Sequence, residues 1–189
     1  MASKVLYTIG HSTHSIEEFI ALLNAHEVRY LVDVRSIPKS RHVPQFNTDE
    51  FASSLRGADI GYTHIKALGG RRSTRKDSIN TGWRNASFRG YADYMATPQF
   101  GEGLAALTAV ALATSTVIMC AEAVPWRCHR SLIADAMMLQ GWEVRDILTG
   151  APAKEHKLTP FLKAVNGQPT YPAPDESGTL FNESSEPGE

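Results

Sequence analysis

The chain has 189 residues, a formal net charge of −1 and an ordinary hydrophobic share of 42%. This length can bury one hydrophobic core without covalent staples, so we expect one folded domain. No apolar run is long enough to cross a membrane, and we expect no membrane partner. The two cysteines, Cys120 and Cys128, form no disulfide framework. A reducing cytoplasm is therefore the expected location.

Charge is distributed unevenly along the chain. Residues 166–189 hold five acidic side chains and no Lys or Arg, and they are rich in Pro, Ser and Gly. Because the whole chain carries −1 and this segment −5, the remainder carries +4. Such a polar composition rarely supplies a core of its own. We therefore predict an α/β domain over residues 1–164 and a disordered acidic tail over residues 165–189.

Strand and helix patterns alternate along the domain. Apolar runs typical of buried strands cover residues 5–9, 30–34, 60–65, 117–120 and 144–148. Helical patterns cover residues 16–23, 48–55, 91–95, 103–113 and 125–140. Ser15 and Glu18 form a capping box before the first helix. This alternation predicts an α/β single-domain, three-layer fold with a mostly parallel sheet and helices on both faces.

Segment 118–131 has the highest concentration of reactive and charged residues in the chain. It lies between a predicted strand and a predicted helix, where α/β proteins bind their ligands. Its reactive and charged residues are Cys120, Glu122, Arg127, Cys128, His129 and Arg130.

A reactive thiol is one interpretation of this segment. Pro125 suits the first position of a helix, which would put Cys128 in the first turn. The helix dipole and basic neighbours, among them His129, would then favour a thiolate nucleophile. The alternative is that these are inert buried cysteines, and for Cys120 within the strand this alternative is favoured.

An anion site is the second interpretation. Free backbone N–H groups at a helix start, with Arg127 and Arg130 beside them, can bind phosphate or a carboxylate. Glu122 is then a candidate general base, with His129 as a further catalytic candidate. A simple salt bridge from Glu122 to one of the arginines is the alternative.

Other polar residues follow the first two predicted strands. His11 is a candidate acid or base and Ser12 a phosphate ligand, while Arg35 could clamp an anion and Asp33 could act as a base or hold Arg35. Capping and ion pairing are the alternative roles for each. No metal-ligand spacing such as Cys-x-x-Cys occurs, so we predict no metal and no cofactor.

A basic stretch runs over residues 71–91. It contains six Lys or Arg side chains and one acid, interleaved with aromatic residues, a pattern that can bind a phosphate backbone and stack on bases. Arg89 and Tyr91 are candidate substrate contacts. The alternative is a solvated surface loop with Trp83 and Phe88 packed into the core.

Taken in order, the motifs resemble one known family. They are Thr8-Ile-Gly-His-Ser12, Val32-Asp-Val-Arg35, Phe88-Arg-Gly-Tyr91, Cys120-x-Glu122 and Cys128-His129-Arg130. Over about residues 5–150 the chain is similar to the domain-of-unknown-function family numbered 488. The resemblance implies an intracellular α/β domain with polar residues clustered at strand ends, and it leaves the reaction open.

We therefore expect an enzyme that acts on a phosphate-bearing substrate, a nucleotide or nucleic acid. Phosphate would bind at the helix start of residues 128–130 with Arg35, and Glu122 or His11 would supply acid–base catalysis. Two alternatives stay open. One is a transferase or redox enzyme that uses a Cys128 thiolate, and the other is a non-catalytic nucleic-acid-binding module that uses residues 71–91. The sequence does not indicate an oligomeric state.

Overall fold

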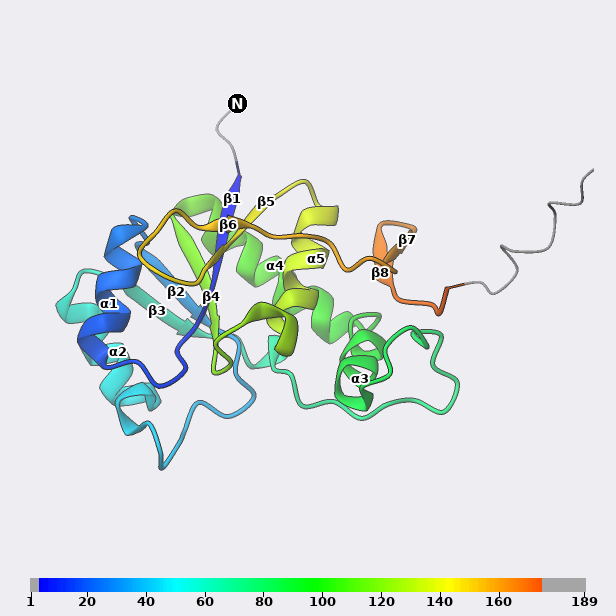
Figure 1. The fold of residues 1–189 in the computed structure, drawn as a ribbon, viewed down its shortest axis with the longest axis horizontal. Coiled ribbons are helices and arrows are strands. Elements are labelled where there is room, and N and C mark those ends of the chain that lie inside the picture. The colour runs from blue at the N-terminus through cyan, green and yellow to red at the C-terminus, as the bar shows by residue number, and fades with distance from the viewer. Residues whose placement is uncertain (1–3, 175–189) are drawn as a thin grey trace, which may run out of the picture.

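The computed structural model describes residues 4–174. Its main sheet has the strand order β3-β2-β4-β1-β5-β6 (Figure 1). The strands are β1 (Val5–Gly10), β2 (Tyr30–Asp33), β3 (Gly61–His64), β4 (Thr116–Cys120), β5 (Glu143–Ile147) and β6 (Lys154–Glu155). The first five pair in parallel, and β6 pairs antiparallel to β5 at the edge. The predicted mostly parallel sheet is confirmed.

Helices cover both faces of this sheet. They are α1 (Ile16–Ala25), α2 (Thr48–Gly57), α3 (Ala86–Tyr94), α4 (Pro98–Ala113) and α5 (Arg130–Leu139). One core cluster packs α1 and α2, through Phe19 and Phe51, against one face of the sheet. The other cluster packs α3, α4 and α5 against the opposite face (Figure 1). The three-layer α/β architecture follows from these two cores.

Local signals explain where two of the helices begin. The capping box at α1 is present, because the Ser15 side chain accepts the Glu18 N–H and the Glu18 side chain accepts the Ser15 N–H. Helix α3 begins five residues earlier than predicted, at Ala86. The Asn85 side chain accepts backbone N–H groups of the first turn, which makes this asparagine an effective N-cap.

The predicted helix over residues 125–140 is divided in the structure. Pro125–Arg127 forms a short 3-10 turn, and the Cys128 N–H closes it on the Pro125 carbonyl. Cys128 then has extended backbone angles, φ −134° and ψ 142°, and α5 begins at Arg130. The prediction that Cys128 lies in the first turn of a helix is therefore wrong. Proline starts a turn here, but the extended residue that follows separates this turn from α5.

The folded domain extends past the predicted boundary at residue 164. Strands β7 (Lys163–Val165) and β8 (Gln168–Thr170) form a hairpin. Tyr171 follows it, is fully buried, and donates its hydroxyl hydrogen to Asp135. One large aromatic anchor thus fixes residues 165–174, whose average composition is polar. The remainder of the predicted acidic tail, residues 175–189, lies outside the described residues.

The sheet topology creates a natural ligand position between β2 and β4. The chain leaves β2 through α2 toward β3, and it leaves β4 through α5 toward β5, on the opposite face. Where the connections of two neighbouring parallel strands diverge in this way, a crevice opens beyond their carboxyl ends. The residues that follow Asp33 and Cys120 meet at this crevice.

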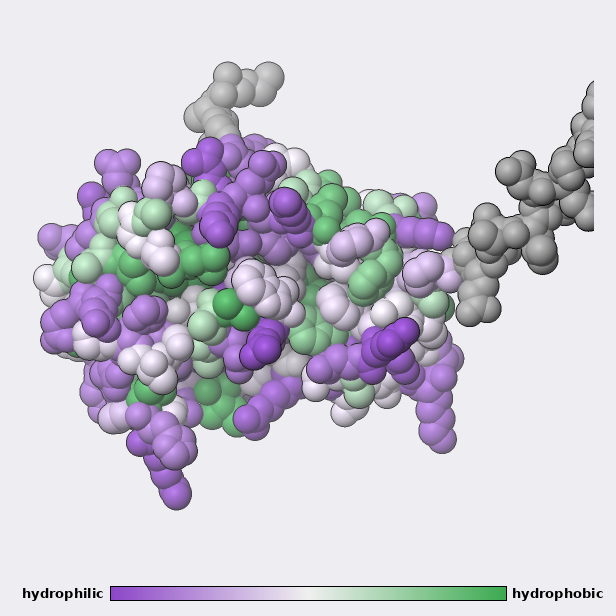
Figure 2. Space-filling view, in the orientation of Figure 1, coloured by the Kyte–Doolittle hydropathy of each residue, from purple (hydrophilic) through white to green (hydrophobic). Residues whose placement is uncertain are grey.

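Within residues 4–174, no helix is both long and apolar enough to cross a membrane. The face seen in Figure 2 has hydrophilic and hydrophobic side chains interspersed.

Candidate functional site

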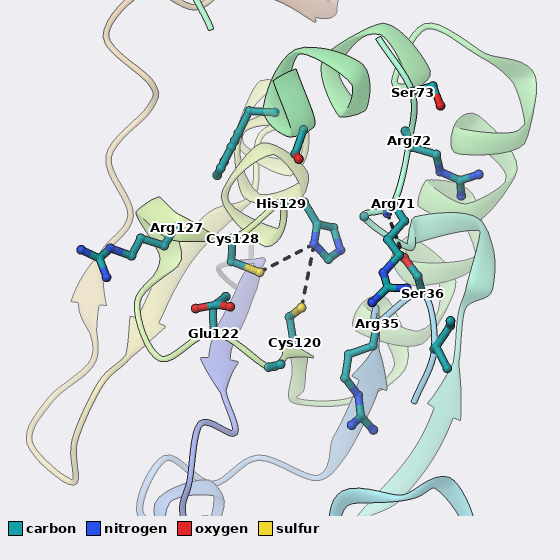
Figure 3. Close-up of a pocket in the computed structure, with 15 residues that line it drawn as sticks. Arg35, Ser36, Arg71, Arg72, Ser73, Cys120, Glu122, Arg127, Cys128 and His129 are labelled. Atoms are coloured by element: carbon teal, nitrogen blue, oxygen red, sulfur yellow. Dashed lines mark hydrogen bonds between the residues drawn. The ribbon is translucent and has the colours of Figure 1, made fainter. Parts of the chain in front are cut away.

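An open cavity of about 600 Å³ lies at the carboxyl ends of β2 and β4 (Figure 3). Its volume falls within the roughly 300–1,000 Å³ that is usual for small-molecule sites. Three parts of the chain line it: the segment after β2, the turn between β4 and α5, and two pieces of the long connection before α4. The lining residues used below are Arg35, Ser36, Gly70, Arg71, Arg72, Phe88, Cys120, Glu122, Arg127, Cys128 and His129.

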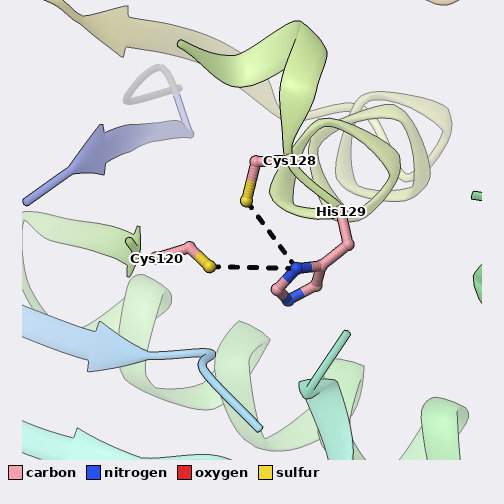
Figure 4. A group of neighbouring side chains, drawn as sticks. All are labelled: Cys120, Cys128 and His129. Atoms are coloured by element: carbon pink, nitrogen blue, oxygen red, sulfur yellow. Dashed lines mark hydrogen bonds between the residues drawn. The ribbon is translucent and has the colours of Figure 1, made fainter. Parts of the chain in front are cut away.

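Two thiols and one imidazole meet in this cavity (Figure 4). Cys120 ends β4, and Cys128 and His129 immediately precede α5. The His129 Nδ1 atom lies 3.9 Å from the Cys120 sulfur and 3.7 Å from the Cys128 sulfur. Both cysteines are buried and free, and the imidazole is half-buried. The predicted pair of Cys128 and His129 is thus brought together with Cys120.

The orientation of the His129 ring is set from its far side. Its Nε2 atom lies 2.9 Å from the Val34 carbonyl oxygen. A carbonyl only accepts hydrogen bonds, so Nε2 carries a hydrogen and, in the neutral ring, Nδ1 presents a lone pair to the sulfurs. The Tyr91 ring packs edge-on at 4.9 Å. A Cβ atom at Gly70 would come closer than 3.0 Å to three atoms of the ring. The imidazole therefore fits only against a glycine.

The two thiols are unequal. A hydrogen bond from Cys120 lowers the pKa of Cys128 well below its ordinary value despite burial, and His129 and Arg130 lower it further. The same hydrogen bond, together with burial, raises the pKa of Cys120 well above its ordinary value. When the pair loses one proton, the thiolate is therefore at Cys128.

Arginines supply positive charge around the cysteines. Arg71 and Arg127 are exposed. The half-buried Arg72 stacks on the Tyr94 ring at 3.6 Å and donates from Nε to the Gly69 carbonyl. Of these three, Arg127 was a predicted site residue, whereas Arg71 and Arg72 were noted only within the basic stretch. A phosphate-sized anion in the cavity would meet this positive charge.

Glu122 lies in the same cavity, two residues after the end of β4, and its side chain is exposed. Glu122 therefore shares this cavity with both cysteines.

Arg130 is not a substrate ligand in this geometry. Its side chain is fully buried and donates to the carbonyl oxygens of Glu122, at 2.5 Å, and Ala123, at 3.0 Å. The guanidinium thereby fixes the turn between Cys120 and Cys128. Its buried positive charge favours the thiolate form of both cysteines. The direct anion contact expected of Arg130 is replaced by this structural role.

Asp33 and Arg35 form a buried ion pair of 2.6 Å at the end of β2. Arg35 also donates to the Phe46 carbonyl at 2.7 Å. Arg35 borders the cavity, but Figure 3 shows its guanidinium pointing away from the cysteines. Arg35, the expected anion ligand, is thus paired with groups inside the protein. Asp33 holds Arg35, which is one of the two roles predicted for it.

His11 and Ser12 follow the end of the neighbouring strand β1. Within residues 4–174, neither of them lines the cavity. The His11 ring is buried and stacks on Phe46 at 4.4 Å. Burial lowers the pKa of His11 to about 4, with a further contribution from Arg35, so the ring is neutral near pH 7. Ser12 donates its backbone N–H to the Ala121 carbonyl. Both residues therefore support the turn after β4.

Arg89 and Tyr91 also have internal partners. Arg89 donates twice to the Trp83 carbonyl, at 3.0 and 2.7 Å. The hydroxyl of the fully buried Tyr91 donates to the Leu68 carbonyl at 2.8 Å, while its ring contacts His129. Within residues 4–174 neither side chain lines the cavity, although Tyr91 reaches it indirectly through its contact with His129.

Three contributors to the site were missed by sequence reasoning. They are the Val34 carbonyl, Gly70, and Ser36, whose hydroxyl accepts the Arg71 N–H at 2.9 Å. The Gly69-Gly70 pair was the one visible signal, because adjacent glycines often mark a close approach of the backbone to another group.

The fold and the site define a doubly wound α/β protein with a Cys–Cys–His centre at its topological switch point. The chain belongs to the family described as domain of unknown function DUF488, which matches residues 15–137. This match confirms the family resemblance, and the matched segment contains both cysteines and His129. No curated protein and no solved structure matches the chain.

Proposed function

We propose that this protein is an enzyme that acts on a phosphate-bearing substrate, a nucleotide or nucleic acid, in the cavity between β2 and β4. One observation carries the proposal. The cluster of two cysteines and His129 lines the same cavity as Arg71, Arg72 and Arg127.

The arginines give the cavity its preference for an anion. A guanidinium binds phosphate oxygens through parallel N–H groups, which makes arginine well suited to phosphate recognition. Arg71 and Arg127 lie on opposite sides of the cysteines in Figure 3. The half-buried Phe88 lines the cavity as well and adds apolar contact area for a base beyond the face that it stacks on Trp83. Phosphate and base could therefore be held together.

Two groups support catalysis in addition to binding. The His129 Nδ1 lone pair can accept a proton, and Glu122 provides a carboxylate in the same cavity. A carboxylate repels a phosphate, so a site built only to bind one would gain nothing from Glu122. The combination favours an enzyme over a simple binding module.

The test is binding of adenosine monophosphate and hydrolysis of bis(p-nitrophenyl) phosphate by the full chain, compared with Arg71→Ala and Arg127→Ala. A hydrogen bond to a charged group contributes about 1.5–3 kcal/mol, so each variant should bind at least roughly 10-fold more weakly. Arg84→Ala is the matched control. Arg84 is exposed and belongs to the same basic stretch, but within residues 4–174 it does not line the cavity. Equal weakening in the control, or no binding at low ionic strength, would refute the proposal.

A second candidate function uses Cys128 as a nucleophile in transfer or redox chemistry. The distance of 3.7 Å from its sulfur to His129 Nδ1 favours it, because a base in contact activates a thiol. It predicts that Cys128→Ser abolishes turnover while Cys120→Ser retains part of it. Full activity of the Cys128→Ser variant would exclude this mechanism.

The non-catalytic module that uses residues 71–91 finds less support. Arg75 pairs with Asp77 at 2.8 Å, and Arg89 is engaged by the Trp83 carbonyl. Trp83 and Phe88 stack on each other at 4.7 Å and pack against the core, so their shared faces are not available to bases. The stretch stays a candidate extension of the phosphate-binding surface.

A further inference from the structure

The thiol–imidazole cluster has the composition of a metal site. Its three donor atoms are the sulfurs of Cys120 and Cys128 and the Nδ1 of His129, and all lie within 4.8 Å of one another. They come from the end of β4 and from the residues before α5, and all three point toward a common centre (Figure 4). Thiolate and imidazole are the ligands that zinc prefers in proteins.

The sulfur–nitrogen spacing of these donors is close to that around a tetrahedral ion. With Zn–S bonds of about 2.3 Å and Zn–N bonds of about 2.0–2.1 Å, the S···N edge of a tetrahedron is roughly 3.6 Å. The observed S···N separations are 3.7 and 3.9 Å. These two separations exceed the tetrahedral edge by only about 0.1 and 0.3 Å, and the two sulfurs lie within 4.8 Å of each other. We propose that Cys120, Cys128 and His129 bind a zinc ion.

The surroundings of the ring support this assignment independently of the distances. A metal-bound histidine usually donates its other ring N–H to a carbonyl or carboxylate, which fixes the ring and strengthens the ligand. His129 makes this contact with the Val34 carbonyl at 2.9 Å. Gly70 and Tyr91 enclose the ring, and the buried Arg130 fixes the turn between the cysteines. The donor set is therefore organised before an ion arrives.

Three protein ligands leave a fourth position on zinc open, as in catalytic rather than structural sites. All three donors line the cavity, so this position faces the space that also contains Glu122, Arg71 and Arg127. A structural Cys₄ or Cys₂His₂ site would instead be closed to ligands.

The use of this open position rests on the proposed function. Zinc lowers the pKa of a bound water, and Glu122 would accept the proton that this water releases. The resulting hydroxide would form a bond to phosphorus while the bond from phosphorus to the leaving oxygen breaks. Glu122 would return its proton to that oxygen. In this mechanism Cys128 is a ligand and not a nucleophile.

The proposal reverses the expectation of no metal, which rested on the absence of a Cys-x-x-Cys motif. Cys120 and Cys128 are eight positions apart, a spacing that is not typical of zinc sites. The intervening turn, closed by the Cys128 N–H on the Pro125 carbonyl and fixed by Arg130, brings the two sulfurs together nonetheless.

Cobalt spectroscopy of the full chain tests the site without any substrate. The protein is treated with a chelator and a reductant, both thiols are counted as free, and Co²⁺ is added. We expect intense visible bands of tetrahedral cobalt and a thiolate-to-cobalt charge-transfer band that saturate at one ion per chain. Zn²⁺ should displace the cobalt stoichiometrically. Cys120→Ser, Cys128→Ser and His129→Ala should each weaken or shift these bands, whereas the exposed-loop control His42→Ala should keep them.

Each outcome decides the question. If fully reduced wild-type protein shows no cobalt bands, the metal site is overturned. This measurement does not depend on whether the cysteine variants fold. If the cobalt bands are unchanged in a folded His129→Ala variant, His129 is not a ligand, and the proposed three-residue zinc site is overturned. Cobalt bands without adenosine monophosphate binding would support the metal site and refute the proposed function. The reverse result would refute the metal site alone.

Discussion

His129 donates its Nε2 hydrogen to the Val34 carbonyl oxygen, 2.9 Å away, and so links the residue before α5 to the residue after β2. The bond crosses the crevice between two strands whose connections leave in opposite directions. It also determines which ring nitrogen faces the cysteines. A rotated ring would present an N–H donor to the sulfurs, and neither metal binding nor proton abstraction would follow.

The first prediction concerns the tautomer of His129. Because Val34 requires a donor, the neutral ring should carry its hydrogen on Nε2 and leave Nδ1 bare in reduced, metal-free protein. Two-bond ¹H–¹⁵N correlation spectra of the histidine rings will show this pattern, and His129→Gln assigns the signal. A signal with the hydrogen on Nδ1 would contradict the arrangement on which both mechanisms depend.

The second prediction concerns Gly70. A methyl group there would come closer than 3.0 Å to the His129 ring, so Gly70→Ala should displace the imidazole. Overpacking of this kind costs about 1–3 kcal/mol, which urea denaturation will detect as a lower free energy of unfolding. The variant should also lose its cobalt bands.

Gly101→Ala is the matched control for Gly70→Ala. Gly101 lies inside α4 and has open space around its added methyl group. Alanine there should stabilise the protein by about 0.5–1 kcal/mol, because alanine is the better helix former. If both alanine variants behave alike, close contact with His129 is not the reason for Gly70.

The sequence predicted the elements and the place of the site well, because both follow from local patterns. Apolar runs identified the five parallel strands, and Ser15 with Glu18 marked the start of α1. The order of strand, reactive turn and helix placed Cys120, Glu122 and Cys128 at the edge of the sheet where the cavity lies. Parallel strands align their carboxyl ends, so this inference needed no tertiary information.

The roles of individual side chains could not be predicted in the same way. Arg35 and Arg130 looked like anion ligands, yet their partners include the carbonyl oxygens of Phe46 and Glu122. Backbone carbonyls occur at every residue, so no sequence pattern reveals which ones a buried arginine will satisfy. The contact of Gly70 with His129 is equally non-local, since it depends on packing between distant parts of the chain.

The third prediction concerns the buried ion pair of Asp33 and Arg35. Asp33→Asn would leave the Arg35 charge buried beside a neutral group and would weaken the hydrogen bond that Tyr62 donates to Asp33. Breaking a buried pair from one side costs about 3–5 kcal/mol. Urea denaturation should show a loss of this order.

Asp77→Asn is the control for Asp33→Asn. It removes an exposed pair with Arg75, so the free energy of unfolding should hardly change. A small effect of Asp33→Asn, similar to that of the control, would mean that Arg35 finds another partner or reaches solvent.

The last prediction concerns the pH dependence of stability and the buried His156. Burial alone would lower the pKa of His156, but the Asp135 carboxylate, 3.5 Å from Nε2, and the hydrogen bond from Nδ1 to Asp146 outweigh it and raise this pKa from 6.5 to about 9. Between these values the folded protein keeps a proton that the unfolded chain has lost. The resulting stabilisation is complete below about pH 6.5 and disappears as the pH rises through about 9, with an upper bound of roughly 3 kcal/mol.

His156→Gln should therefore flatten the decline in unfolding free energy between pH 7 and about pH 9.5, measured by urea denaturation at constant ionic strength. His42→Gln, on an exposed loop, should keep the wild-type slope. Equal slopes in wild-type protein and His156→Gln would show that His156 is not held as an imidazolium between the two carboxylates.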